Sequence, residues 1–448
     1  MSESGAAEAR RGRLRAPPTF ASLRHADFRL LWITTVLSAA ANWLQQVTLG
    51  WLAFDLTDSA LVAGVVFGIR SLPMLLVGPL GGVLGDRFAR KAGLMINSGR
   101  MAVVALAFAM LLVAGSVEVW HILLFTTVQG LGQALVNPVR YAMVANTVPQ
   151  ADLMNAIALN SFAFSTMRVV GPAAAGVLIA VSGPELNFAI QGAFFALTFL
   201  LVLPIHTPYS TLSLNRSHAS MASSLAGGVK YVVNQPTILG LTLLGLGPAF
   251  FTTPINLGLL PVFARESLDV GSQGLGVLYS MQGVGAVLAT LAIASLGGYR
   301  NIGWLVAVAA IGNALAVCFY SQLTIFVLAL PFLAMATLCF TAYSTVSQTI
   351  IQTITPDEYR GRVMGLHMMD HGLTPLGSLV FGVIAEYYDV SGAMLLAGLS
   401  GLAFVLIVLA RYPMVRAYRT GRPAATLMPE PPARGARDEI ATIEPAAD

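Results

Sequence analysis

The chain has 448 residues, of which 56% are hydrophobic and only 10% are charged. Soluble domains carry about 25% charged residues, so this chain cannot cover itself with a water-compatible surface, which excludes a soluble enzyme. The net charge of +4 comes almost wholly from arginine, since Lys91 and Lys230 are the only lysines. We attribute this positive charge to membrane topology and expect no binding to nucleic acid.

Hydrophobic runs long enough to cross a hydrocarbon core about 30 Å thick recur along the sequence. They predict an all-α membrane protein whose N-terminal six spans lie near 28–55, 59–85, 91–115, 119–147, 152–182 and 187–206. The C-terminal six lie near 237–264, 271–296, 301–320, 322–355, 358–386 and 391–412. The predicted N-terminal bundle is thus 28–206, and the C-terminal bundle is 237–412.

The remaining segments are polar. Residues 1–27 hold five arginines without the apolar core of a signal peptide, which predicts a cytosolic tail. Residues 207–236 are expected to form a cytosolic linker that ends in an amphipathic segment. Residues 413–448, rich in Pro, Ala and Arg, are expected to form a disordered cytosolic tail.

The distribution of charge over the loops sets the orientation. With the N-terminus in the cytosol, every basic loop residue falls inside except Arg265. The outer loops then hold the acids Asp55, Asp58, Glu118, Glu185, Glu266, Asp269 and Asp389. The sequence therefore predicts a multi-pass protein with both termini in the cytosol.

The chain also repeats itself. Gly171 and Gly176 align with Gly377 and Gly382, an offset of 206 residues. The segment 59–64 aligns with 271–276, an offset of 212 residues. Two parallel, pseudo-symmetric six-helix bundles are therefore expected, with a substrate site between them near the middle of the membrane.

A short basic turn separates the second and third spans and contains Gly82, Asp86, Arg87, Arg90 and Lys91. It resembles the signature loop of the major facilitator superfamily, with Ala89 in place of the usual second glycine. The resemblance implies the major facilitator fold and a cytosolic latch in which Asp86 faces the N-terminal end of span 11. The alternative is a positive turn that only fixes topology.

Span 5 contains Gly171-Pro172, followed by Gly176. It resembles the Gly-Pro-x-x-Gly-Gly antiporter motif of drug exporters, with Ala175 in place of the first paired glycine. Such a motif bends the helix and allows a neighbouring helix to approach closely. The alternative is a helix kink with no meaning for transport.

The segments 57–87 and 129–161 resemble the macrolide-efflux and enterobactin-exporter branch of the drug:proton antiporters, and the resemblance runs from about 20 to 412. It implies a secondary active transporter in the plasma (inner) membrane of a bacterium. Such a protein exports a mid-sized amphipathic small molecule (a drug, macrolide or siderophore) by alternating access, in exchange for protons. It works without a cofactor or metal, and we expect a monomer. Thr126 stands where many drug exporters carry an arginine, which excludes proton coupling through that residue.

Ionisable residues inside the membrane are expensive, so each needs a partner or a role. By helical rise, Arg70 in span 2 lies about 22 Å and Asp370 in span 11 about 18 Å from the cytosolic side. We expect them to meet in one conformational state, because spans 2 and 11 touch in the family fold. His367, Asp370 and His371 share one helix face and, with Arg70, are the candidate proton-coupling residues. The alternatives are a static ion pair with two satisfied histidines or, with fewer ligands than usual, a metal site.

Other polar side chains within the spans are expected to point inward, since amides facing lipid cost too much. Arg168 and Gln282 form a second candidate pair. The predicted substrate cavity contains Asn42, Gln45, Gln46, Gln129, Gln133, Asn137, Arg140, Arg168, Asn256, Gln282 and Gln348. The alternative is that these groups only hold helices together. Phe162, Phe164, Phe250 and Phe251 are candidate aromatic walls.

Two further function classes stay open. A lipid or lysolipid translocator has the same architecture, and a non-transporting membrane sensor is the third hypothesis. A primary pump is excluded because the chain lacks a Gly-x-x-x-x-Gly-Lys-Ser/Thr loop.

Overall fold

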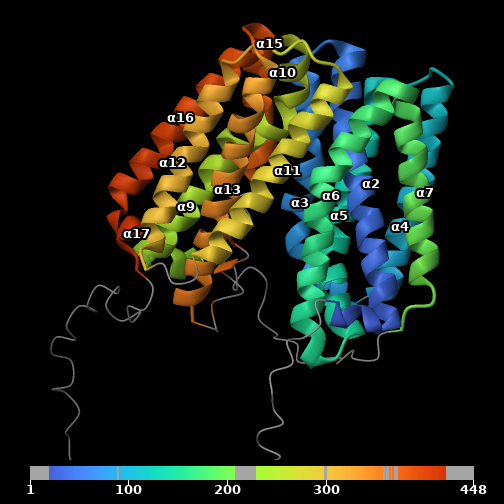
Figure 1. Cartoon of the computed structure of the whole chain (residues 1–448), viewed down its shortest axis with the longest axis horizontal. Coiled ribbons are helices and arrows are strands. Elements are labelled where there is room, and N and C mark those ends of the chain that lie inside the picture. Colours follow the sequence, from blue (N-terminus) through green and yellow to red (C-terminus); the bar gives the residue numbers. More distant parts are fainter. Residues whose placement is uncertain are drawn as a thin grey trace, which may run out of the picture.

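The computed structural model describes residues 20–87, 90–206, 229–296, 300–356, 359, 363–364, 366–367 and 372–419, apart from the side chains of 74–87, 135, 137–138 and 141–142. Over this range the regular structure is helical, as predicted, and the helices follow the expected spans in order (Figure 1). Eight of the described helices are long and apolar enough to cross a membrane.

The N-terminal half forms one bundle. Its long helices are α2 (Ala26–Thr57), α3 (Ala60–Arg87), α4 (Arg90–Val113), α5 (Val119–Thr147), α6 (Leu153–Ser182) and α7 (Pro184–Val202). Helix α2 packs on α6 and α7, while α3 and α4 both pack on α5. A short 3-10 helix, η1 (Ala21–Arg24), precedes α2, and Ser22 docks it on α6 through a hydrogen bond to Asn155 Oδ1.

The C-terminal half forms the second bundle. It contains α9 (Pro236–Phe251), η3 (Ile255–Leu259), α10 (Leu260–Glu266), α11 (Ser272–Ser295), α12 (Ile302–Ser321), α13 (Phe326–Ile354), α15 (Thr374–Tyr387), α16 (Val390–Arg411) and α17 (Pro413–Ala417). Helix α12 packs on α13 and α16, and α11 packs on α13.

Local signals at the helix ends explain where several spans begin. Glu118 caps α5, and its backbone N–H donates to His121 Nδ1 at 3.1 Å, which completes a capping box. Asp389 Oδ2 accepts from the Gly392 N–H at 2.8 Å and so caps α16. Helix α2 ends at Asp58, which adopts a left-handed conformation (φ 51°) that Asp tolerates better than most residues. These caps lie in the loops that the sequence predicts on the outer side of the membrane.

The C-terminal tail begins later than predicted. Residues 413–417 form α17, and Val415 and Tyr418 are buried. The Gly303 N–H donates to the Tyr418 carbonyl at 3.1 Å, and a side chain at position 303 would collide with this backbone. The prediction of disorder from 413 onward is therefore wrong for these residues, because the glycine lets the tail dock on α12. Residues 420–448 lie outside the described residues.

Span 7 is not one continuous α-helix. Helix α9 ends at Phe251, a π-helical turn covers Ile255–Leu259, and α10 continues the span to Glu266. Pro248, Pro254 and Pro261 interrupt the backbone hydrogen bonding along this stretch. Isolated π turns occur frequently at functional sites, and this one lies midway along the span.

The two bundles cross at two symmetric points. Helix α3 packs on α15, and α6 packs on α11. A Cβ added to Gly64 would lie 3.5 Å from the Cα of Gly382, and one added to Gly276 would lie 3.1 Å from the Cα of Gly176. By the internal repeat, Gly64 corresponds to Gly276 and Gly176 to Gly382. Both crossings therefore use the same pair of repeated glycines, which allow close backbone approach.

The same two helix pairs are those predicted to meet across the bundles. Gly176 therefore provides the close approach expected of the Gly-Pro motif, and a Cβ on Gly171 would contact the Trp43 side chain at 2.7 Å. Pro172 lies within the continuous helix α6. The predicted bend at this proline stays a prediction.

Candidate substrate-binding site

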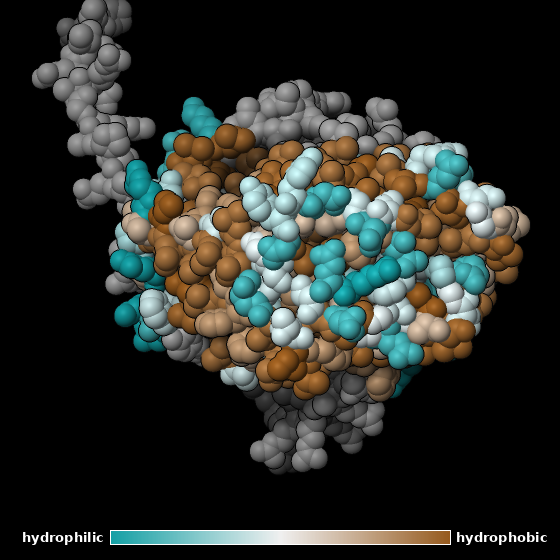
Figure 2. Space-filling model, turned by 90° about the horizontal axis from the view of Figure 1, so that it is seen from above, coloured by the Kyte–Doolittle hydropathy of each residue, from teal (hydrophilic) through white to brown (hydrophobic). Residues whose placement is uncertain are grey.

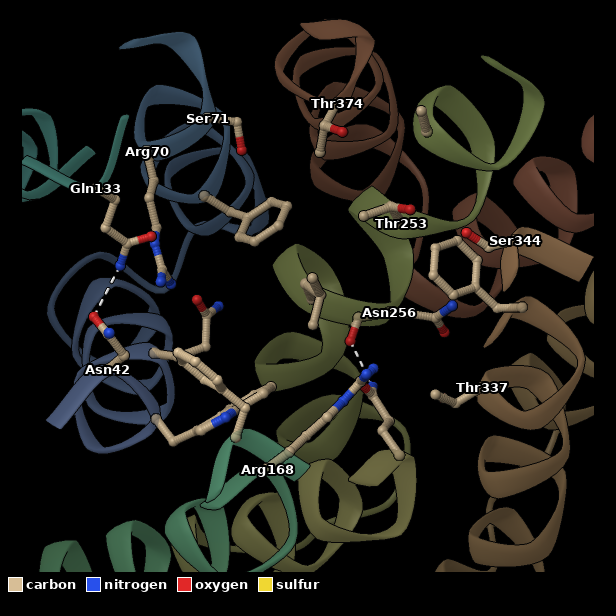
Figure 3. A pocket seen from close by; sticks show the side chains of 18 of the residues that line it. Asn42, Arg70, Ser71, Gln133, Arg168, Thr253, Asn256, Thr337, Ser344 and Thr374 are labelled. Atoms are coloured by element: carbon tan, nitrogen blue, oxygen red, sulfur yellow. Dashed lines mark hydrogen bonds between the residues drawn. The ribbon is translucent and has the colours of Figure 1, made fainter. Parts of the chain in front are cut away.

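A cavity of about 510 Å³ lies between the two bundles. It is lined by α2, α3, α5 and α6 on one side and by α9, η3, α11, α13 and α15 on the other (Figure 3). Its size falls in the range of pockets that hold drug-sized ligands, roughly 300–1,000 Å³. Of the predicted cavity residues, the structure brings together Asn42, Gln46, Gln133, Arg168, Asn256 and Gln282, and adds Arg70.

Amides from two helices form the wall on the N-terminal side. Asn42 Oδ1 accepts hydrogen bonds from Gln133 Nε2 at 2.8 Å and from Gln129 Nε2 at 3.2 Å. This arrangement fixes Asn42 against α5 and occupies its carbonyl oxygen. Gln129 itself is 1% exposed and lies behind the cavity wall, so its role is to position Asn42.

Arg70 reaches the cavity from α3, and Figure 3 shows its side chain extending from that helix into the pocket. The placement depends on a close approach of α3 to α5. A Cβ added to Gly130 would lie 2.5 Å from the Arg70 carbonyl oxygen, so a larger residue there would push α3 away. The predicted partner Asp370 lies outside the described residues, so the Arg70–Asp370 pair stays a prediction.

Arg168 enters the cavity from α6, pointing toward Asn256 (Figure 3). Its Nε is buried and lacks a hydrogen-bond partner among the described residues. Here α6 lies very close to α11, since a Cβ on Gly283 would be 2.6 Å from the Arg168 carbonyl oxygen. Gln282, the predicted partner, lines the same cavity, and its Nε2 donates instead to the Asn256 carbonyl at 2.7 Å.

The π turn of span 7 places Asn256 at the C-terminal wall. Tyr320 Oη donates to Asn256 Oδ1 at 2.5 Å, and Tyr279 Oη donates to the Leu257 carbonyl at 2.7 Å. Because a π turn leaves backbone carbonyls without their usual helical partners, Tyr279 and Gln282 of α11 supply donors to the carbonyls of Leu257 and Asn256, while Tyr320 of α12 holds the Asn256 side chain. The turn is therefore held in place by hydrogen bonds from both helices.

Aromatic side chains form much of the remaining surface. Trp43, Phe67, Phe164, Phe340 and Tyr343 line the cavity. Phe164 was a candidate wall residue and is confirmed. Phe162 is 60% exposed and does not line the cavity, so its assignment as a wall residue is wrong.

Phe250 and Phe251 are also misassigned as cavity walls. They pack with each other at 5.0 Å between ring centroids and against Phe381, inside the C-terminal half. Phe251 also packs against Phe404 of α16, so this end of α9 contributes its rings to the core of its own bundle.

Three other predicted cavity residues lie elsewhere. Gln45 is 1% exposed and accepts from Gln191 Nε2 at 2.5 Å, which ties α2 to α7. Arg140 is 6% exposed and donates to Ser38 Oγ at 3.0 Å, which ties α5 to α2. Gln348 does not line the cavity. The cavity assignment failed for Gln45 and Arg140 for the same reason, because a polar group can avoid lipid by facing the interior of its own bundle.

Several predicted residues cannot be placed. Asp370 and His371, and the side chains of Asn137, Asp86 and Arg87, lie outside the described residues, and Gly82 lies in the backbone of α3. His367 is buried at 7% exposure and does not line the cavity. Of the loop motif, Arg90 begins α4 and Lys91 Nζ donates to the Leu203 carbonyl at 2.6 Å, which joins α4 to the end of α7.

The sequence analysis missed a set of small hydroxyl residues that line the cavity. They are Ser71, Thr253, Thr337 and Thr374. Serine and threonine within helices commonly bond to their own backbone, as Thr48 and Thr126 do here, so they carry little signal in a sequence. Thr374 has one signal, because the repeat aligns it with Arg168.

The bundles are joined at one end of the molecule, hereafter the closed end. Arg265 Nη1 lies 2.8 Å from Asp55 Oδ1, and Glu386 Oε2 accepts from Ser59 Oγ at 2.9 Å and from the Leu61 N–H at 3.1 Å. Figure 1 shows the bundles converging here, near α10 and α15, and separated at the opposite end. Figure 2 views the closed end face-on, with polar side chains gathered across its middle and apolar ones around them.

Known proteins share both the sequence pattern and the fold. Residues 17–437 match the family described as transmembrane secretion effector. The staphyloferrin A transporter of Staphylococcus aureus is 24% identical over 370 residues, covering 82% of this chain and 91% of the relative. The enterobactin exporter EntS of Escherichia coli O139:H28 is 24% identical over 344 residues, covering 76% of this chain and 81% of the relative.

Two solved structures have the same architecture. The nucleoside transporter NupG aligns with a TM-score of 0.71 at 15% identity, covering 86% of this chain and 100% of that chain. A bacterial homologue of the lysosomal transporter Spinster, inward-facing and occupied, aligns with a TM-score of 0.70 at 14% identity, covering 88% and 97%. The family match spans most of the chain and the fold is that of these carriers. The chain therefore belongs to the transmembrane secretion effector family and is a secondary transporter of the major facilitator superfamily.

Proposed function

We propose that this protein exports a siderophore-like compound across the plasma (inner) membrane of a bacterium, in exchange for protons. The observation that carries the proposal is the cavity of about 510 Å³ between two bundles that are joined at the closed end. Such a cavity admits a mid-sized ligand, and its mixed amide and aromatic lining suits an amphipathic one. Relatives that cover most of the chain are named for transport of staphyloferrin A and enterobactin, which supports the substrate class.

Alternating access follows from how the bundles are joined. At the closed end the bundles meet through polar contacts and through apolar side chains such as Phe54 and Phe263, while the crossings of α3 with α15 and α6 with α11 bring the backbones close together. Rocking of the bundles about these crossings would break the polar contacts and expose the cavity at the closed end. From the loop charges we infer that the closed end faces the outside of the cell and that the described state loads substrate from the cytosol.

A vesicle assay tests the proposal. Purified protein is reconstituted into proteoliposomes with an acidic interior, and the pH gradient is followed by a fluorescent dye as iron-free siderophores and macrolides are added outside. We expect a siderophore to dissipate the gradient and to accumulate inside as radiolabelled compound. Siderophore uptake without dissipation of the gradient would contradict only the exchange for protons. The absence of uptake for every siderophore would contradict the substrate class.

The matched control is the same protein locked at the closed end. In a background lacking Cys318 and Cys339, cysteines replace Ser59 and Glu386, whose side chains meet across the bundles. A reversible bis-thiosulfonate cross-linker should abolish uptake, and a reductant should restore it. Uptake that persists in cross-linked protein would show that transport does not pass through this opening.

A further inference from the structure

The charge of the cavity is one-sided. Arg70 and Arg168 are the charged residues among the described side chains that line it, and no described acid does so. The described ion pairs join His25 to Asp152, His206 to Asp27 and Arg265 to Asp55, so neither cavity arginine takes part in them.

The internal repeat makes this asymmetry specific. Arg70 aligns with Gln282 at the offset of 212, and Arg168 aligns with Thr374 at the offset of 206. All four residues line the cavity. The four equivalent positions thus carry two guanidinium groups in the N-terminal half and two neutral hydrogen-bonding groups in the C-terminal half.

Arg168 is held as an unsatisfied donor. Its Nε is buried without a hydrogen-bond partner in the described part of the chain, although Gln282 and Asn256 lie beside the same space. Gln282 Nε2 donates to the backbone carbonyl of Asn256, and Asn256 Oδ1 already accepts from Tyr320 Oη. Neither amide accepts a hydrogen bond from Arg168 Nε, and a buried donor without an acceptor is costly.

A ligand with acidic groups removes this cost. Guanidinium groups pair with carboxylates through two parallel hydrogen bonds, which are strong in a site shielded from water. We infer that the cavity recognises an organic anion, with Arg168 binding one acidic group and Arg70 a second, while the amides and hydroxyls of the C-terminal half bind neutral polar groups. A lipophilic amine is disfavoured at the same place because it would meet two like charges.

This inference rests on the proposed function in that it names the class of substrate for the same cavity. It narrows the three compound types suggested by the sequence to acids such as polycarboxylate siderophores. The aromatic side chains Trp43, Phe67 and Phe164 cover the N-terminal wall around the arginines, which favours an acid that also has an apolar surface.

Matched acid and ester pairs provide the test. Binding to full-length protein in nanodiscs is measured by calorimetry for three acids and their methyl esters: a polycarboxylate siderophore, fusidic acid and a bile acid. We expect at least one acid to bind at least tenfold more tightly than its ester. Equal affinity of acid and ester in all three pairs, or no binding of any acid, would overturn the anion site.

Variants then assign the site to the two arginines. Arg168→Gln and Arg70→Gln should each weaken acid binding by about 10- to 100-fold, in line with the loss of a charge-assisted hydrogen bond, and should weaken ester binding far less because an ester carries no charge. Arg168→Lys should recover part of the loss. Unchanged acid affinity in both glutamine variants would overturn the assignment.

Arg100→Gln is the matched control. Arg100 is also an arginine within a span of the N-terminal bundle, but it donates to Asn97 Oδ1 at 2.8 Å and does not line the cavity. Its substitution should leave acid affinity unchanged, and thermal unfolding verifies that each variant is folded. Acid binding without any transport would contradict the proposed export function but not the anion site. Equal transport of acid and ester would contradict the anion site but not the proposed export function.

Discussion

Arg265 Nη1 lies 2.8 Å from Asp55 Oδ1, and this ion pair joins α10 of one bundle to the end of α2 in the other. The guanidinium also lies 5.8 Å from the ring of Trp51 and 5.6 Å from that of Phe54, both on α2. Arg265 was the exception to the predicted placement of basic loop residues in the cytosol. Its position is explained by an acidic partner on the opposite bundle.

The first prediction concerns this pair. Asp55→Asn should destabilise the closed end by about 0.2–1 kcal/mol, a modest amount because both side chains are more than 40% exposed. Spin-label distances across this end should lengthen in part of the population. The charge-swapped double variant Asp55→Arg, Arg265→Asp should restore the wild-type distances. The control Glu118→Gln changes an outer acid that contacts only its own bundle, and it should leave these distances unchanged.

The second prediction concerns Glu386, whose carboxylate caps the start of α3 from the other bundle. Glu386→Gln removes the negative charge from a helix N-terminus and should cost about 0.3–1 kcal/mol. Combined with Asp55→Asn, it should open the closed end further than either change alone. A double variant no more open than Asp55→Asn would show that Glu386 does not hold the bundles together.

The third prediction tests the crossing of α6 and α11. Gly176→Ala places a Cβ against the backbone of Ser272 and Gly276, so transport and thermal stability should both fall. Gly93→Ala is the control, because a Cβ there meets nothing within 4 Å. It should be neutral or stabilise α4 by up to about 1 kcal/mol through its helix propensity. Equal effects at the two positions would contradict the packing argument.

The fourth prediction concerns the π turn of span 7. Asn256→Ala leaves the buried Tyr320 hydroxyl without its acceptor and should lower the free energy of unfolding by about 1–3 kcal/mol. Adding Tyr320→Phe removes the stranded donor, so the double variant should regain much of that loss. Chemical denaturation in detergent measures the cycle, and strictly additive losses would show that the two groups are not coupled.

The fifth prediction addresses the proposed proton exchange, for which Asp370 is the candidate coupling residue. Asp370→Asn should abolish transport driven by a pH gradient while preserving the exchange of labelled for unlabelled substrate. The control Asp269→Asn changes an acid in an outer loop, where the left-handed backbone (φ 50°) also suits asparagine. Full gradient-driven transport by Asp370→Asn would remove this residue from the coupling mechanism.

Sequence patterns were sufficient wherever the controlling interaction is with the solvent or lies along one helix. Hydropathy located the spans because each helix in the membrane satisfies its own backbone hydrogen bonds, so the signal lies within a single segment of sequence. The Gly171-Pro172 motif with Gly176 predicted a close helix approach, because the absence of a side chain at a glycine can be read from the sequence alone. Arg70 and Arg168 were recognised as exceptional because charge within a span is rare.

Only the tertiary structure decided which polar groups face the cavity. Gln46 lines it while its neighbour Gln45 binds Gln191, and Arg168 lines it while Arg140 binds Ser38. In the sequence these residues look alike, because both the cavity and the bundle interior shield polar groups from lipid. The rotation of each helix against its neighbours, set by side-chain packing across the whole bundle, chooses between the two.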